Sequence, residues 1–121
     1  MSRTGKHPGG GPFIESFIAP DMHMRPVGET VALIEDSGLE VRDVHMMREH
    51  YVRTILAWYD QFESHWDQAV AMVGEEVARV WRLYMVGSAL VFEEGRMGVD
   101  QVLAVKKSPD GRSDMPLVRS W

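Results

Sequence analysis

The 121-residue sequence contains no cysteine, which excludes disulfide bonds and thiolate metal ligands. No apolar run reaches the roughly 18 residues of a membrane-spanning helix, and residues 1–12 lack the apolar core of a secretory signal. Positive charge is also scarce, because 13 basic residues face 18 acidic ones and leave a net charge of −5. That balance does not suit binding to nucleic acid or to an anionic membrane. These absences lead us to expect a cytoplasmic protein without a nucleic-acid partner.

Several common site motifs are missing as well. There is no Gly-x-Ser-x-Gly elbow, no Ser-His-Asp set and no Walker loop. The glycine triplet at 9–11 follows no hydrophobic strand, so it does not predict a phosphate-binding loop. His23, His45 and His50 do not form a His-x-x-x-His pair on one helix face, and we expect no metal site.

The chain is long enough for one domain, and 45% of its residues are hydrophobic. Residues 1–12 are polar and rich in glycine, which indicates a disordered lead-in. We expect the domain itself to span residues 13–107. Residues 108–121, which include a Pro-Asp-Gly turn at 109–111, are expected to form a flexible tail.

The first half of the domain shows short helical and extended patterns. Apolar spacing predicts a short helix over 13–19 that Pro20 ends, and a second helix over 27–37 that Gly38 stops. Alternation of apolar and polar residues predicts a strand over 39–46, and an apolar segment between Gly98 and a Pro-Asp-Gly turn predicts a second strand over 99–106. Because two strands cannot form a stable sheet alone, we interpret them as the edge of a larger α/β sheet.

Between the two strands lie two long helical patterns. The first predicts one continuous helix of about six turns that Gly74 ends, and the second runs from Glu75 to Gly95. The second pattern assigns one buried face to Val77, Val80, Trp81, Tyr84, Ser88 and Val91. Residues 87–89 form a small-residue patch that a backbone or a ligand can approach closely. The aromatic side chains of both helices form either the contact between them or a lipid-binding groove.

Tyr51 is the candidate for chemistry, because it stands at the junction of the first strand and the first long helix. A tyrosine there can donate a hydrogen bond to an anion or hold a general base in place. The alternative is a half-buried aromatic ring with its hydroxyl at the surface. Spacing alone leaves both interpretations open.

From about Phe13 to Lys106, five segments occur in the order seen in one enzyme family. The chain resembles the C-terminal part of the cyclopropane-fatty-acid synthases, which include the mycolic-acid and fatty-acid methyltransferases of actinobacteria. The matching segments are Phe17-Ile18-Ala19-Pro20, residues 34–41, His50-Tyr51-Val52-Arg53-Thr54 with Trp58, residues 82–87, and residues 98–102.

The resemblance implies a fold and an activity. It implies the C-terminal portion of a Rossmann-like class I methyltransferase, with edge strands, long helices and an incomplete sheet. Such enzymes transfer a methyl group from S-adenosylmethionine to a cis double bond of an acyl chain, and a bound bicarbonate then removes a proton. The bicarbonate-holding tyrosine of the family falls on Tyr51. The acyl chain would pass along the long helices, where Trp58, Tyr84 and Gly87 are the candidate substrate-binding residues.

The chain also departs from the family pattern. The Gly-rich cofactor loop and the other bicarbonate contacts lie upstream in the family, and no counterpart occurs here. Ala19-Pro20-Asp21-Met22 replaces Phe-Pro-Gly-Gly, which leans toward the methyl-branching subgroup. We therefore predict a C-terminal fragment that binds no cofactor and is inactive alone, with an N-terminal half of the enzyme as a partner. Because its substrate is a lipid, peripheral contact with the inner face of the membrane is also compatible with this prediction. The alternative is a stand-alone helical module that binds lipids or docks a partner without catalysis.

Overall fold

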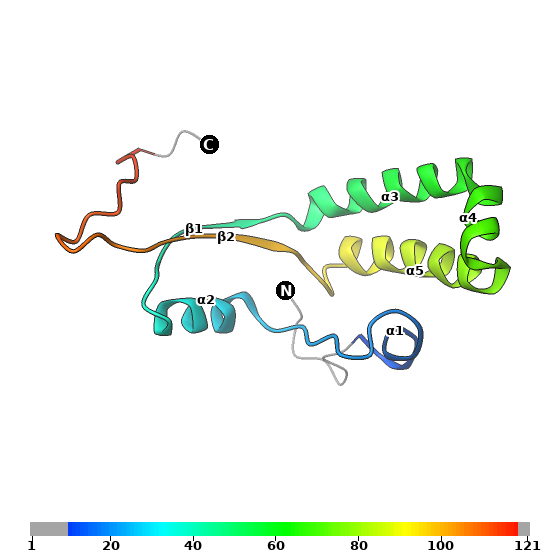
Figure 1. The fold of residues 1–121 in the computed structure, drawn as a ribbon, viewed down its shortest axis with the longest axis horizontal. Helices are drawn as coiled ribbons and strands as arrows, with labels where there is room; N and C mark the ends of the chain where they lie inside the picture. The colour runs from blue at the N-terminus through cyan, green and yellow to red at the C-terminus, as the bar shows by residue number, and fades with distance from the viewer. Residues whose placement is uncertain (1–9, 119–121) are drawn as a thin grey trace.

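The computed structural model describes residues 10–118, which follow the order α1, α2, β1, α3, α4, α5, β2. The molecule is drawn out along one axis, with the strands and α2 at one end and α3, α4 and α5 at the other (Figure 1). Residues 1–9 of the predicted lead-in and 119–121 of the predicted tail lie outside the described part. Pro12, which we had assigned to the lead-in, is instead the first residue of α1 (Pro12–Phe17). Proline suits a first helical position, because its missing N–H would have no helical partner there.

The predicted order of helix and strand is confirmed by α2 (Val27–Asp36) and β1 (Glu40–Met46). The Ser37 hydroxyl donates to the carbonyl of Ile34 at 2.6 Å and so satisfies one of the last helical acceptors. Gly38 follows with a φ of 91°, a left-handed conformation that glycine adopts without strain. The glycine stop inferred from the sequence is therefore the real end of this helix.

The sheet has two strands in the described part of the chain. β1 pairs antiparallel with β2 (Asp100–Val105), and the register is irregular between Val41 and Asp43. The ladder extends beyond both strands, since the N–H of Met47 donates to the carbonyl of Val99 at 2.9 Å. α2 packs against both strands, as Figure 1 shows. The sheet thus remains narrow, as the strand count in the sequence predicted.

The long helical region between the strands contains three helices instead of the predicted two. α3 (Arg48–Ser64) and α4 (Trp66–Val73) replace the single six-turn helix, and α5 (Glu75–Glu93) follows. The Ser64 hydroxyl donates to the Gln61 carbonyl at 2.8 Å, and Nδ1 of His65 lies 2.9 Å from the same oxygen. The N–H of His65 turns to Phe62 instead, at 3.2 Å. The side chains of Ser64 and His65 thus occupy the Gln61 carbonyl, which would accept from the His65 N–H in a continuous helix. This competition explains the break.

The core lies between α3 and α5, which run antiparallel and are joined through α4 and Gly74 (Figure 1). Gly74 has a φ of 83° and turns the chain between α4 and α5. The core cluster consists of Ile55, Met85, Ala89 and Phe92. This corrects the predicted buried face of α5, because Trp81 remains 42% exposed and Val77 43% exposed. The predicted face and the observed face of α5 are both apolar, and the packing against α3 determines which of them is buried.

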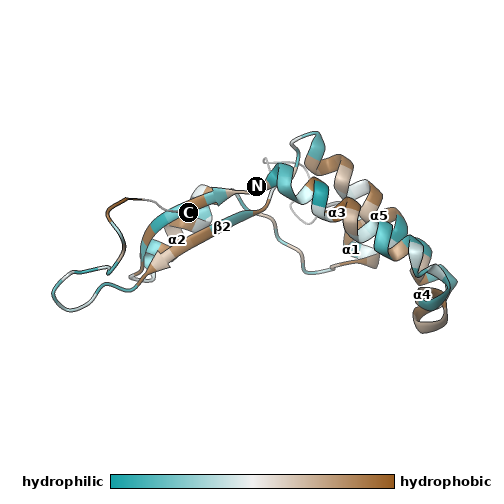
Figure 2. Ribbon diagram, turned by 90° about the horizontal axis from the view of Figure 1, so that it is seen from above, coloured by the Kyte–Doolittle hydropathy of each residue, from teal (hydrophilic) through white to brown (hydrophobic). Residues whose placement is uncertain are grey.

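Apolar side chains also remain exposed along the helical end, where hydrophobic and hydrophilic segments alternate over α3, α4 and α5 (Figure 2). They include Leu56, Trp58, Met72, Leu83 and Leu90. Within residues 10–118, no helix combines the length and the apolar character needed to cross a membrane.

Candidate functional site

Tyr51 occupies the first turn of α3, close behind the end of β1. Its N–H donates to the carbonyl of Met47 at 3.0 Å, which ties the start of the helix to the residue that extends the strand ladder. The side chain is half-buried and packs against the core cluster between α3 and α5. The structure thus places Tyr51 at the junction of β1 and α3, as predicted.

The ring of Tyr51 is held by two aromatic neighbours. It stacks on Phe92 of α5, with ring centroids 5.7 Å apart and planes inclined by 22°. The edge contact with Trp58, about two turns farther along α3, has a centroid distance of 6.3 Å and an angle of 83°. Both geometries are favourable for aromatic pairs. The rotation of the tyrosine ring is therefore restricted from two sides.

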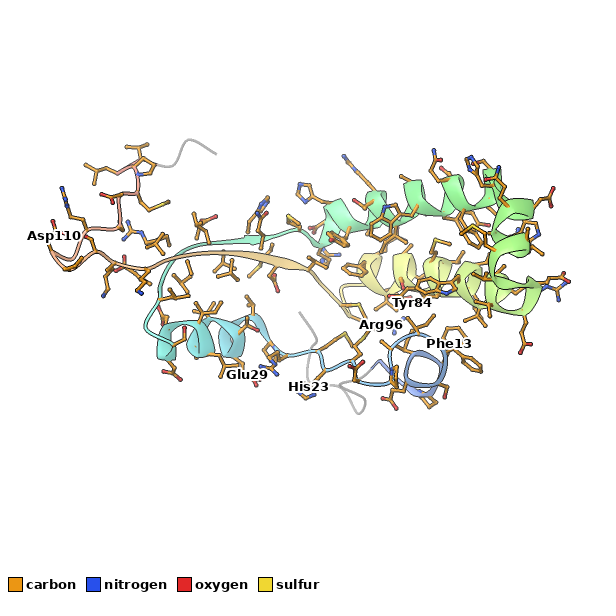
Figure 3. All side chains as sticks on the ribbon, in the orientation of Figure 1. Phe13, His23, Glu29, Tyr84, Arg96 and Asp110 are labelled. Carbon is orange, nitrogen blue, oxygen red and sulfur yellow. The ribbon has the colours of Figure 1, made fainter. Side chains whose placement is uncertain are left out.

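The structure brings only part of the predicted site together. Trp58 contacts Tyr51, whereas Tyr84 makes its ring contact with Trp81 on its own helix, at 5.5 Å and 87°. Tyr84 lies on the side of α5 toward α1, the helix that carries Phe13 (Figure 3). Gly87 is half-buried, and a Cβ added to it would meet no atom within 4 Å. Tyr84 and Gly87 therefore belong to a different part of the α5 surface from the Tyr51 contacts.

Two hollows on the described surface lie away from the predicted site. One, between α1 and the start of α5, is lined by Phe13, Glu75, Glu76, Arg79, Val80 and Leu83. The other, beside the start of α2 and of β2, is lined by Met24, Arg25, Val27, Thr30, Gly98, Asp100 and Val102. Neither of these two hollows includes Tyr51 or Trp58.

A charged cluster connects the far ends of α3 and α5. The guanidinium of Arg82 donates to the Glu63 carboxylate at 2.5 Å and lies over the Trp66 ring, 5.1 Å from its centroid. The hydroxyl of Tyr59, followed by the Glu63 carboxylate, raises the pKa of Arg82 above its usual value. The other carboxylate oxygen of Glu63 is buried without a hydrogen bond inside the described chain. The cluster thus links α3, α4 and α5 through Glu63, Trp66 and Arg82.

The histidines within residues 10–118 are spread over several elements. His45 of β1 and His50 of α3 meet edge to face, with ring centroids 5.6 Å apart. His23 lies in the segment between α1 and α2 (Figure 3). Within residues 10–118, no group of three or more histidine, cysteine or acidic side chains could hold a metal ion.

Two residues around Tyr51 escaped the sequence reasoning. Phe92 is 5% exposed and stacks on the tyrosine ring. It was not predicted, because it lies outside the set of α5 residues that the sequence pattern assigned to the buried face. Arg48 is the first residue of α3, and its guanidinium reaches the end of α5. A signal for Arg48 did exist, because a cation at the positive end of a helix is unfavourable unless it has another partner.

Comparison with known proteins adds to this geometry. The family model described as mycolic acid cyclopropane synthetase matches residues 1–102. A probable fatty acid methyltransferase of Pseudomonas putida is 39% identical over 111 residues, which are 92% of this chain and 28% of that protein. A probable fatty acid methyltransferase of Mycobacterium tuberculosis is 38% identical over 111 residues, covering 92% of this chain and 26% of that protein. The chain spans less than a third of the length of these relatives.

Solved structures show the same partial correspondence. The mycolic acid cyclopropane synthase CmaA1, crystallised with SAH and CTAB, is similar with a TM-score of 0.71 and 26% identity. The cyclopropane synthase MmaA2 from Mycobacterium tuberculosis gives a TM-score of 0.71 and 25% identity. Each similarity covers 76% of this chain and 32% of the solved chain. The predicted fold class is confirmed over this part.

Proposed function

Since the chain belongs to the mycolic acid cyclopropane synthetase family, we propose that it forms the C-terminal part of an S-adenosylmethionine-dependent methyltransferase for unsaturated acyl chains of lipids. The product is a cyclopropane ring or a methyl branch. The observation that carries the proposal is the similarity of three quarters of the chain to one third of a synthase solved with SAH and CTAB. The lipid methyltransferases among the relatives support the same substrate class.

The chain alone is proposed not to bind S-adenosylmethionine. In open α/β sheets, cofactors bind where the carboxyl ends of parallel strands meet. β1 and β2 are antiparallel, so their carboxyl ends point to opposite ends of the described sheet. β1 leads into α3 through Met47 alone, and no helix follows β2 within residues 10–118, so neither described strand is followed by a Gly-rich loop that opens a helix. The residues present do not fit the cofactor, and the rest of a methyltransferase domain has to supply its site.

Isothermal titration of the purified chain with S-adenosylmethionine tests this part of the proposal. We expect no stoichiometric heat, because the described residues offer neither a Gly-rich loop nor a crevice of parallel strands. The positive control is a complete relative such as the Pseudomonas putida protein. Stoichiometric binding in the micromolar range by this chain would contradict the proposed division of labour.

Tyr51 is proposed to hold the bicarbonate that serves as the base in this family. When bound, bicarbonate accepts the proton that the methylated acyl chain loses. Tyr51 fits one side of such an anion site, because its phenolic O–H is a donor and its ring is fixed by Phe92 and Trp58. The family's remaining anion contacts lie outside the segments that this chain matches. In this chain alone, the tyrosine is therefore expected to be idle.

A chimera tests the role of Tyr51 directly. This chain would replace the matching 111 residues of the Pseudomonas putida relative, and methyl transfer to phospholipid acyl chains would be measured. We expect an active chimera whose turnover falls by about 10²-fold in Tyr51→Phe, the typical loss when one anion-stabilising donor is removed. Tyr59→Phe removes a hydroxyl from the same helix and serves as the matched control. Equal activity of Tyr51→Phe and Tyr59→Phe would sink the assignment.

Trp58 is proposed as a contact of the acyl chain beside Tyr51, and Tyr84 and Gly87 are proposed as contacts on another part of the α5 surface. Trp58 is 54% exposed beside Tyr51, so an apolar chain laid along α3 would cover it. Gly87 offers open space on α5 for close approach. In the chimera, Trp58→Ala is expected to raise KM for the lipid more than it lowers kcat, because the contact is made before and during the reaction. An unchanged KM would remove Trp58 from the substrate path.

Partners follow from the same proposal. The N-terminal part of a methyltransferase domain would cover the strands and the exposed apolar side chains, and the lipid substrate would bring the enzyme to a membrane surface. The alternative is a non-catalytic module that binds acyl lipids with those exposed side chains. A thermal melt with and without oleic acid separates the two. Stabilisation by oleic acid without any N-terminal part favours the module, whereas stabilisation only by the N-terminal part favours the methyltransferase.

A further inference from the structure

Arg48 connects the beginning of α3 to the end of α5. Its guanidinium donates to the carbonyl of Phe92 at 2.8 Å and to the carbonyl of Glu93 at 3.2 Å. The same side chain forms an ion pair with the adjacent Glu49. The contact with Phe92 is partly buried and joins residues 44 positions apart. Arg48 is therefore a tertiary contact and not a feature of α3 alone.

The carbonyls that Arg48 binds lie in the last turn of α5. The last four carbonyls of a helix have no intrahelical donor, and the C-terminal end of a helix carries partial negative charge. The N–H of Gly95 also reaches the Phe92 carbonyl, at 3.1 Å. A cation that donates two hydrogen bonds there satisfies both the geometry and the dipole. The cost of a cation at the start of α3 is offset by Glu49.

Phe92 is the residue that relates this contact to Tyr51. Its backbone carbonyl is held by Arg48, while its buried ring stacks on the ring of Tyr51. Arg48 and Tyr51 are three positions apart on α3 and so lie on neighbouring parts of its surface. The backbone of Phe92 is thus held by Arg48 of α3, and the side chain of Phe92 in turn supports Tyr51 of α3.

We propose that Arg48 is a positioning residue for Tyr51, which fixes the tyrosine ring by holding the backbone of Phe92 beneath it. The inference rests on the proposed anion-binding role of Tyr51. Loss of the guanidinium frees the end of α5, and the Phe92 ring then no longer restricts the tyrosine ring. The hydroxyl of Tyr51 would sample several directions, and the anion would lose a donor of fixed geometry.

Proton NMR of the tyrosine rings in this chain tests the positional part. The sequence has three tyrosines, and the signals of Tyr51 are assigned from the Tyr51→Phe variant. We expect Arg48→Ala to move the Tyr51 signals toward those of a free tyrosine, while the Tyr84 signals stay in place. Arg48→Lys, which keeps a cation, restores most of the shift, and Arg48→Gln restores less. Glu49→Gln removes the neighbouring ion pair and leaves the Tyr51 signals unchanged.

The NMR signals alone show whether Arg48 positions the ring of Tyr51, and no activity measurement is needed. Unmoved Tyr51 signals in Arg48→Ala overturn it, and so does an equal movement of all three tyrosines, which indicates general loosening. If Arg48→Ala unfolds, the lysine and glutamine variants decide, because identical signals in these two exclude a role for the cation.

Kinetics of the chimera test the part that depends on the proposed function. We expect Arg48→Ala to lower kcat by about tenfold with little change in KM, since a misplacement of about 1 Å can cost up to 10²-fold. Unchanged kcat in an active chimera overturns the positioning role. A chimera that is inactive with the native chain but keeps the expected ring shifts instead overturns the proposed function.

Discussion

The helical end of the molecule, formed by α3, α4 and α5, has a core of its own, whereas the strand end, formed by α2, β1 and β2, has none. Within residues 10–118, every buried hydrophobic side chain belongs to α3 or α5, namely Ile55, Ala78, Met85, Ala89 and Phe92. At the strand end, Val44 and its partner Val102 are only half-buried, and Leu103 is 38% exposed.

The difference shows what each kind of element needs from the rest of a protein. Two antiparallel helices can bury a common apolar stripe against each other without a further layer. A two-stranded sheet leaves backbone N–H and C=O groups unpaired on both outer edges and requires further strands or layers. The strand end is therefore the part that depends most on the proposed N-terminal portion of the domain.

Truncation of the core is expected to produce the largest effect. Phe92→Ala removes a buried ring that packs on Tyr51 and the core cluster, and such changes cost about 3–5 kcal/mol of unfolding free energy. Val102→Ala at the strand end is expected to cost about 1.5 kcal/mol or less, because the side chain is only half-buried. Urea unfolding followed by tryptophan fluorescence and far-UV circular dichroism measures both. Equal costs would break the distinction between the two ends.

The Arg82 cluster is expected to contribute less. Arg82→Met removes the ion pair with Glu63 and the contact with the Trp66 ring, and both groups are partly exposed. We expect a small loss of unfolding free energy, larger than that from one exposed ion pair, because Arg82→Met removes a modest ion pair and a cation–π contact together. Arg79→Met, which removes a more exposed pair with Glu75 one turn away, is the matched control with an expected loss of about 0.3–0.5 kcal/mol. A smaller loss for Arg82→Met than for Arg79→Met would show that the cluster does not hold the helices together.

The elements that local patterns determine were predicted well. α2, β1 and β2 begin and end within two residues of their predicted limits, because alternation, helical spacing and Gly38 act locally. The errors arise where tertiary contacts or side-chain competition decide. His65 and Ser64 divide the predicted long helix by taking the Gln61 carbonyl, and the spacing of apolar residues contains no trace of this.

The candidate site follows the same rule. Tyr51 and Trp58 share one helix, and their rings are in contact. Phe92 and Arg48 could not be paired from the sequence, because their contact spans 44 positions and depends on which apolar face of α5 turns toward α3. The functional roles of Tyr51, Trp58, Tyr84 and Gly87 stay predictions for the chimera to test.

The smallest effect is expected at the strand end, where acid should act through Glu40. The hydrogen bond from Arg42, with further help from Lys107, lowers the pKa of this carboxyl below its ordinary value. A carboxyl whose pKa is lower in the folded than in the unfolded chain stabilises the fold above the unfolded pKa, about 4.3 for a glutamate, and loses that contribution as the pH falls through the folded pKa. Glu40→Gln should therefore unfold slightly more easily at pH 6 and match the native chain at the lowest pH. Hydrogen exchange of the β1 amides between pH 3 and 6 measures the difference, with Arg42→Gln as the matched variant.

Because Glu40 pairs with Val105 across the strands and touches neither α3 nor α5, its effect should be confined to β1 and β2. An equal change in the amides of α5 would mean that the two ends of the molecule unfold as one unit.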